Sequence, residues 1–321
     1  VLGLGNERAG LMVLYLPDDT LEAMDIAPPE IADAIEAALN GKAEGHLHVS
    51  PKSAILPGGG RYMMSTLAVG DVTVVKQVTV SPNNPSRGLP AINGAIMVLD
   101  SETGLLRAVM GANWITAHRT AALSAVAARR LADPNASTIA FVGCGVQARS
   151  HLQAFRTMFP LTTVLAVGRT KATIDDFLEH AASSGLTTRQ EEADTALSEA
   201  DIVVTSITLN YDTSPFLRAD LLKPQAFAAI TDLCIPWRDD GMDAFGTVIV
   251  DDMEQETTAE KPMLAADRIS GDLTDLVTGR TSLDMTRPRA FAFRGIALGD
   301  YAAAALALRK AEETGAGQRI G

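Results

Sequence analysis

Hydrophobic and polar positions at the start of the chain predict a small domain that mixes helix and strand. Residues 13–16 form a short apolar run typical of a strand. The apolar positions Ile31, Ala34, Ile35 and Ala38 then recur at helical spacing. A strand followed by an amphipathic helix therefore opens the first domain.

The next segment is rich in predicted strands. Three β-branched or alternating runs are separated by turn-forming clusters and predict an antiparallel or mixed sheet: 62–67, 72–80 and 95–99. A helix is predicted over 116–131, and the breaker Asp-Pro-Asn at 133–135 ends it. We place the boundary of the first domain at this breaker.

Beyond the boundary the pattern becomes strand, glycine-rich turn, helix, strand and helix. Further short apolar runs follow, of the kind that is buried on both faces of a parallel sheet. The predicted elements are strands at 138–142, 164–167, 202–206, 227–233 and 248–250, and helices at 147–159, 171–182 and 300–313.

The fold class predicted is therefore α/β, with a Rossmann-type doubly wound parallel sheet and a β-rich α+β N-terminal domain. We expect the N-terminal domain over 12–133 and the nucleotide-binding domain over 134–299, with the helix in 300–321 packing back on the first domain. Residues 1–11 contain Gly3, Gly5 and Gly10, but no strand precedes them, so we interpret them as an extension.

Composition narrows the function classes. The net charge of -12 disfavours binding to nucleic acid or to anionic membranes, and no apolar stretch has the length of a membrane-spanning helix. Cys144 and Cys234 fit no metal or disulfide spacing, so we expect no metal site. With no recognisable secretion signal, these features predict a cytoplasmic protein.

A dinucleotide-binding turn is predicted at Gly143-Cys144-Gly145-Val146-Gln147-Ala148. Gly143, Gly145 and Ala148 follow a predicted strand and open a predicted helix. In this context glycine lets the backbone approach a pyrophosphate held at the helix N-terminus. The alternative interpretation is a plain tight turn.

The end of the second predicted strand favours NADP over NAD. An acid here would bind a ribose hydroxyl and repel a 2'-phosphate, but the sequence is Gly168-Arg169-Thr170-Lys171. Arg169, Thr170 and Lys171 offer two cations and a hydroxyl to a phosphate. The alternative is that Arg169 is a surface charge and Lys171 begins a solvated helix, and NAD remains possible.

Charged residues inside apolar sequence predict a substrate site. Lys76 interrupts a strand, Arg119 lies in an almost wholly apolar helix, and Lys52 follows a proline. Asp232 ends an apolar run at the carboxyl edge of the predicted parallel sheet, where ligands of such sheets bind. The cations suit a substrate carboxylate and the acid suits an amine or iminium. Alternatively, Lys76 lies on a solvated sheet face and Asp232 caps a turn.

Several motifs resemble the ornithine cyclodeaminase and mu-crystallin family, from about Met12 to Glu313. Arg119-Thr120-Ala121-Ala122 followed by the Gly143 turn is the most distinctive pair. The matching segments are 75–77, 82–85, 88–90, 99–104, 116–122, 142–148, 200–203, 271–273 and 293–300.

The resemblance implies a homodimer formed through the N-terminal domain and an active site between the two domains. It implies that Lys76 and Arg119 contact a substrate carboxylate and that Asp232 lies by the reacting nitrogen. The residues it assigns to the cofactor are Thr120, Gly143, Gly145, Val146, Gln147, Ala148, Thr205, Ser206 and Arg294. Lys52 stands where many members carry arginine, and the loop after Asp232 lacks the glycines of the cyclodeaminases.

The leading hypothesis is an NADP-dependent oxidoreductase that reduces an α-imino acid by hydride transfer, or oxidises the amino acid. Lys76 and Asp232 are the candidate catalytic residues, and Lys52 and Arg119 complete the substrate site. One alternative is a cyclodeaminase that releases ammonia from ornithine or lysine. Another is a non-catalytic protein of the mu-crystallin type that binds NADPH and a small effector.

Overall fold

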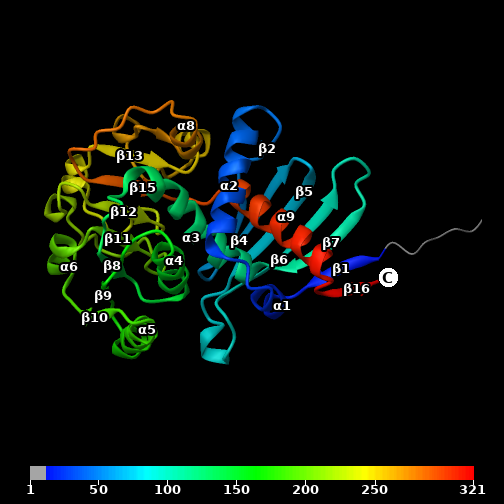
Figure 1. Cartoon of the computed structure of the whole chain (residues 1–321), viewed down its shortest axis with the longest axis horizontal. Helices are drawn as coiled ribbons and strands as arrows, with labels where there is room; N and C mark the ends of the chain where they lie inside the picture. Colours follow the sequence, from blue (N-terminus) through cyan, green and yellow to red (C-terminus); the bar gives the residue numbers. More distant parts are fainter. Residues whose placement is uncertain (1–11) are drawn as a thin grey trace, which may run out of the picture.

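Two eight-stranded sheets organise the chain, and the computed structural model describes residues 12–321. The extension predicted for 1–11 lies outside the described residues. Figure 1 shows the sheets side by side, with α2 and α3 between them. The elements of the first half are β1 (Val13–Leu16), α1 (Asp18–Ala23), α2 (Pro28–Ala43), β2 (His48–Val49), β3 (Ser53–Gly58), β4 (Arg61–Val69), β5 (Val72–Val80), η1 (Pro85–Arg87), β6 (Ile92–Asp100), β7 (Leu106–Gly111) and α3 (Ala112–Leu131).

The N-terminal sheet has the order β16-β1-β7-β6-β5-β4-β2, with β3 paired to β4. Its strands pair antiparallel except for β1 with β7. One face is buried, and along β5 it carries Val74, Lys76 and Val78 in alternation. Helix α9 (Ala297–Thr314) lies across β4 and β5, and β16 (Gln318–Ile320) pairs with β1, so the end of the chain returns to the first sheet (Figure 1).

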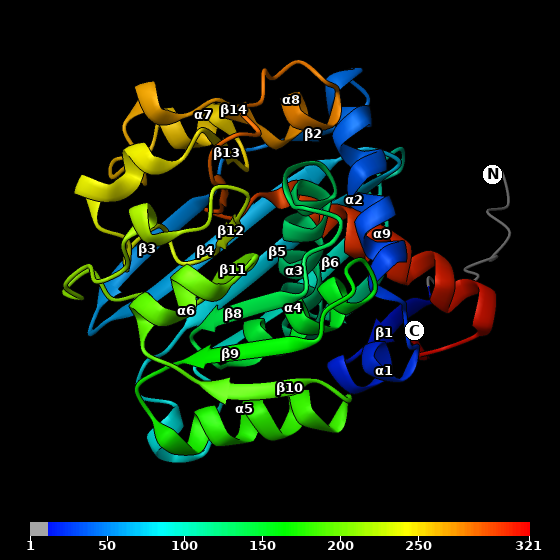
Figure 2. The same ribbon diagram turned by 60° about the vertical axis from the view of Figure 1, so that its left-hand side comes forward.

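The second sheet is wholly parallel, in the order β10-β9-β8-β11-β12-β15-β13-β14. Figure 2 shows β8, β9 and β10 running in one direction. This doubly wound sheet, beside the largely antiparallel first sheet, confirms the predicted fold class. The elements are β8 (Thr138–Val142), α4 (Val146–Arg156), β9 (Thr163–Val167), α5 (Lys171–Ser183), β10 (Thr187–Gln190), α6 (Ala193–Glu199), β11 (Ile202–Thr205), η2 (Ala219–Leu221), β12 (Phe227–Ile230), η3 (Asp239–Ala244), β13 (Thr247–Val250), α7 (Met253–Thr257), η4 (Ala266–Arg268), β14 (Gly271–Asp272), α8 (Leu273–Val277) and β15 (Arg289–Ala292).

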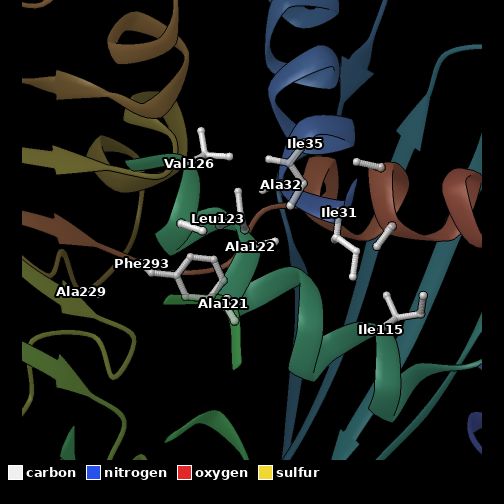
Figure 3. Packing of buried hydrophobic residues seen from close by; sticks show 14 of the residues in the cluster. Ile31, Ala32, Ile35, Ile115, Ala121, Ala122, Leu123, Val126, Ala229 and Phe293 are labelled. Carbon is white, nitrogen blue, oxygen red and sulfur yellow. The ribbon is translucent and has the colours of Figure 1, made fainter. Parts of the chain in front are cut away.

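Helix α3 is the element that joins the two halves. It packs on α2 and α9 on one side and on α4 and β15 on the other. Figure 3 shows its side chains Leu123 and Val126 among those of α2 and Phe293. Because protein surrounds the helix, most of its residues are buried, and Arg119 is only 5% exposed. Arg119 is therefore enclosed by protein at the junction of the two halves.

Within residues 12–321, no helix combines the length and the apolar character needed to cross a membrane. The same part of the chain contains no group of three or more His, Cys, Asp or Glu side chains arranged to hold a metal ion.

Candidate functional site

The predicted dinucleotide turn connects β8 to α4. Gly143 has a φ of 97°, and a Cβ added to it would lie 2.7 Å from the carbonyl oxygen of Ser206. Only glycine fits this position without displacing backbone. The Gly143 amide donates to the Val167 carbonyl at 2.9 Å, which places the turn beside the end of β9.

Open space surrounds the second glycine of this turn. A Cβ added to Gly145 would meet nothing within 4 Å, and Val146 is 67% exposed although it is apolar. No side chain caps the N-terminus of α4 at Gly145, and the Gln147 Oε1 atom is buried without a hydrogen-bond partner. Uncapped amide groups at a helix N-terminus attract an anion such as a pyrophosphate. The turn therefore has the geometry that a dinucleotide needs.

Arg169, Thr170 and Lys171 are exposed next to this turn, at the start of α5. The Thr170 side chain caps no backbone amide. Lys171 donates to both carboxylate oxygens of Asp175 at 2.8 Å, so its charge is partly neutralised on its own helix. Arg169 and Thr170 are therefore the better placed of the three to hold a phosphate.

Lys76 and Arg119 meet at one buried carboxylate that the sequence analysis did not select. Asp300, in the first turn of α9, is 1% exposed and accepts a hydrogen bond from Lys76 Nζ at 2.9 Å and one from Thr66 at 3.1 Å. Burial alone would raise the pKa of Asp300, but the charges of Arg119 and Lys76 outweigh burial and hold it below its usual range. Asp300 is therefore ionised between two cations.

Arg119 retains unused hydrogen-bonding capacity. Its Nε lies 2.9 Å from Asp300 Oδ1, within ion-pair distance, but this N–H is not aligned for a hydrogen bond. Its Nη1 is buried and has no partner among the described residues. The guanidinium also lies over the Phe293 ring, 5.1 Å from the centroid. A buried guanidinium with free donors is a ready site for a carboxylate.

Lys52 lies near the same group. A Cβ added to Gly295 would be 3.5 Å from Phe293 Cζ and 3.6 Å from Lys52 Nζ, so both side chains border Gly295. Burial lowers the pKa of Lys52 to about 8, although the charge of Asp251 opposes this shift. Burial likewise lowers the pKa of Lys76 to about 8, against the charge of Asp300. Lys52, Lys76 and Arg119 are thus near enough for their charges to act on one another, and their contact with a substrate stays a prediction.

The structure does not bring Asp232 to these cations. Its carboxylate is fully buried and accepts from Thr205 Oγ1 at 2.9 Å and from the Ile207 amide at 3.1 Å. Trp237 donates to the same Thr205 hydroxyl and belongs to the hydrophobic cluster on the face of the parallel sheet away from α3. Burial raises the pKa of Asp232 to about 7, and no neighbouring charge contributes to that shift. The oxygens of Asp232 close the loop after β11, and its place beside the substrate nitrogen stays a prediction.

Asp232→Asn tests this prediction. Asn cannot accept from both Thr205 and Ile207, so one buried donor loses its partner, and we expect the free energy of unfolding to fall by about 1–3 kcal/mol. Urea denaturation and kcat/KM should be measured together. A loss of kcat/KM beyond the loss of folded protein would place Asp232 in the reaction, and an unchanged kcat/KM would exclude it.

The side chains of three other predicted cofactor residues make hydrogen bonds within the protein. The hydroxyl of Thr120 donates to the Thr116 carbonyl at 2.7 Å, and that of Ser206 donates to Gly143 at 3.4 Å. Arg294 donates to Glu256 at 2.8 Å and to the Lys261 carbonyl at 2.9 Å. The Arg294 guanidinium is thus tied to the segment after α7, and its assignment to the cofactor stays a prediction. Ser206 does lie against that turn.

Comparison with known proteins identifies relatives along most of the chain. Residues 17–315 match the model of the ornithine cyclodeaminase/mu-crystallin family. An alanine dehydrogenase of Archaeoglobus fulgidus is 32% identical over 60% of this chain and 59% of its own length, less than two thirds of that protein. The ketimine reductase mu-crystallin of Mus musculus is 28% identical over 74% of this chain and 76% of its own.

A solved structure shares the fold over nearly the whole chain. It is the Δ1-pyrroline-2-carboxylate reductase of Thermococcus litoralis, in complex with NADH and L-proline. The two chains superpose with a TM-score of 0.86 at 22% identity, over 96% of this chain and all of that one. At this identity the likeness concerns the fold alone.

Proposed function

The chain belongs to the ornithine cyclodeaminase/mu-crystallin family, and on that premise we propose that it is an NADP-dependent oxidoreductase of small α-imino and α-amino acids. The direction proposed is reduction of a ketimine or cyclic imine to the amino acid. The observation that carries the proposal is a group of three cations at the junction of the two domains, in which Lys76 and Arg119 pair with the buried carboxylate of Asp300 and Lys52 lies nearby.

Charge balance supports a substrate that carries a carboxylate. Lys76 and Arg119 share Asp300 as their counter-ion, which leaves one positive charge in a buried setting. Such a charge is costly unless an anion compensates it. The unpartnered Nη1 of Arg119 offers that anion a directed hydrogen bond. An α-imino acid would supply its carboxylate here.

When bound, the reduced nicotinamide supplies the hydride that converts the C=N bond of the substrate into CH–NH. The contribution of this chain is to fix the substrate carboxylate through Arg119 and Lys52, and so to set the position of the adjacent carbon. Lys76 holds Asp300 and keeps the cationic group together. Because the hydride comes from the cofactor and an iminium ion already carries its proton, the chain needs neither an activated nucleophile nor a proton donor for this step.

Arg169 and Thr170 support NADP as the cofactor. Both are exposed beside the Gly143 turn, and no acid stands at the end of β9.

Arg169→Asp is expected to weaken NADPH binding by about 10- to 100-fold, as loss of a charge-assisted hydrogen bond implies, and to leave NADH binding unchanged. Nucleotide fluorescence titrations measure both. Arg218→Asp, at an exposed arginine that directly precedes η2, is the matched control. An unchanged preference for NADPH would refute the assignment.

The outer face of the N-terminal sheet supports a homodimer. Leu67, Val75, Met97, Val109 and Tyr15 pair in register across β4, β5, β6, β7 and β1. Leu67, Met97 and Tyr15 are each about two fifths exposed, at 38%, 43% and 40%. A continuous apolar row on an uncovered sheet face is typical of a subunit interface. We propose that a second copy of the chain covers it.

A reducing compartment is proposed for the protein. Both cysteines, Cys144 and Cys234, are free thiols buried in the second domain. Free thiols and the absence of a disulfide within residues 12–321 are typical of the cytoplasm.

Purified protein with NADPH tests the reaction. Candidate substrates are pyrroline and piperideine carboxylates, and mixtures of pyruvate, glyoxylate or oxaloacetate with ammonia or methylamine. The proposal expects NADPH oxidation that matches amino acid formation mole for mole. Binding of NADPH without turnover of any of these imines would refute it.

A further inference from the structure

One short segment connects the parallel sheet to α9 and passes the cationic group on the way. Residues 293–296 follow β15, and Gly295 has a φ of 101°. Phe293 in this segment lies under Arg119, and the Gln255 side chain donates to the Gly295 carbonyl at 3.1 Å. The backbone conformation of residues 293–296 therefore determines which groups lie next to Arg119 and Lys52.

Asp251 holds this segment from the side of the parallel sheet. It directly follows β13, whose last residue pairs with the last residue of β15. Its Oδ2 accepts from the Arg294 amide at 3.1 Å and from the Gly295 amide at 2.5 Å. The side chain is fully buried, and its Oδ1 has no hydrogen-bond partner within residues 12–321. A buried carboxylate with two backbone donors is a strong local anchor.

Lys52 meets the same segment from the N-terminal domain. Its Nζ donates to the Arg294 carbonyl at 2.8 Å, so the peptide units on either side of Arg294 bind Asp251 and Lys52. An ammonium has three donors, and this bond uses one. The lysine side chain has several rotatable bonds, whereas arginine presents a rigid fork. Lys52 therefore needs an external anchor to keep a defined direction.

We propose that Asp251 is a positioning residue for substrate binding. It holds Arg294 and Gly295 in place, so that the Arg294 carbonyl fixes the Lys52 ammonium toward the substrate carboxylate. Asp251 acts across the domain junction without touching the substrate. The inference rests on the proposed function for the identity of the ligand, a planar 2-carboxylate.

The charges around both groups agree with this arrangement. The charges of Lys52 and Asp252 act on Asp251, and those of Asp251, Arg119, Arg294 and Asp300 act on Lys52. Burial raises the pKa of Asp251 to about 6, and the two backbone amides and Lys52 oppose that shift. Protonation of Asp251 below pH 6 would weaken its hold on the segment. Lys52 should then bind the substrate carboxylate less tightly as the pH falls.

A double-mutant cycle tests the coupling. The readout is the Kd of pyrrole-2-carboxylate, a non-reacting carboxylate, for the protein saturated with NADPH. Asp251→Asn is expected to raise this Kd about 10-fold in the wild-type background, the scale of one positioned charge-assisted bond, and to have no further effect in Lys52→Met. Kd for NADPH should stay unchanged. Asp252→Asn removes a neighbouring charge that binds Lys42, and is the matched control. Equal losses in both backgrounds, or none in wild type, would overturn the proposal.

A second measurement covers the case in which Asp251→Asn does not fold. In the wild-type protein the Kd of the analogue should rise below pH 6, and this acidic limb should be absent in Lys52→Met. A limb that persists in Lys52→Met would overturn the proposal. Analogue binding is independent of turnover. Protein that binds the analogue but reduces no imine would refute the proposed reaction and leave the role of Asp251 standing.

Discussion

Replacing Arg119 by Ala is expected to lower kcat/KM for the imino acid by about 10²- to 10³-fold, because truncating one member of a buried charge pair costs several kcal/mol. The guanidinium has free donors for the substrate, and its loss also leaves Asp300 with Lys76 as its remaining counter-ion. Steady-state kinetics with varied imino acid and saturating NADPH measure the effect.

Arg119→Lys is the matched variant for this test. It keeps the positive charge near Asp300 but loses the planar fork that lies over Phe293. An intermediate loss of kcat/KM is expected, with most of it in KM. The Kd for NADPH should not change in either variant. If Arg119→Ala raised the Kd for NADPH and left KM for the imino acid intact, Arg119 would belong to the cofactor site.

Asp300→Asn is expected to have the largest effect on stability. It leaves Lys76 and Arg119 buried without a counter-charge, and such a break costs about 3–5 kcal/mol of unfolding free energy. Thr66→Val is the control. It removes one hydrogen bond to the same carboxylate and should cost only about 1 kcal/mol. Chemical denaturation compares the two variants, and equal effects would contradict the role of Asp300 as counter-ion.

The pH profile gives Asp300 a second test. The Lys76 ammonium, with a pKa of about 8, loses its charge as the pH rises through 8, so kcat/KM of the wild-type enzyme should fall above pH 8. Asp300 raises the pKa of Lys76 by its charge. Without that charge the alkaline limb should move to lower pH. A limb that stays in place would show that Lys76 does not titrate under the control of Asp300.

Five strands of the parallel sheet were predictable because their signals are local. β8, β9, β11, β12 and β13 are short, mostly apolar runs, and the Gly143 turn stands between a strand and a helix. β10, β14 and β15 were not predicted; β10 is polar and β15 begins with Arg289. The strand β3 was missed because all of its residues are exposed and no alternation marks it. Helix α3 begins at Ala112 and not at 116. The sequence gives no signal for this start, because the residue before it, Gly111, has no capping side chain. The exact ends of helices and strands depend on tertiary packing and not on the sequence pattern of apolar and polar residues.

The cations of the site were predicted from the sequence, but their acidic partners were not. Lys76 and Arg119 stand out because charge is rare in apolar sequence. Asp300 carries the same signal, in an alanine-rich helix, and could have been found by it. Asp232 and Asp251 both follow strands of the parallel sheet, so their sequence signals are alike. Which carboxylate faces the domain junction depends on loop geometry, including the positive φ of Leu233 and Cys234 after Asp232.

The most direct test of the account compares piperideine-2-carboxylate with the same cyclic imine lacking its carboxylate, in the presence of NADPH. The account predicts that the carboxylated imine is reduced mole for mole with NADPH oxidation, without release of ammonium, and that the imine without a carboxylate reacts at least 100-fold less well, about what loss of its ion pairs at Arg119 and Lys52 implies. Equal reduction of both imines, or release of ammonium from ornithine or lysine with only catalytic nicotinamide, would contradict it.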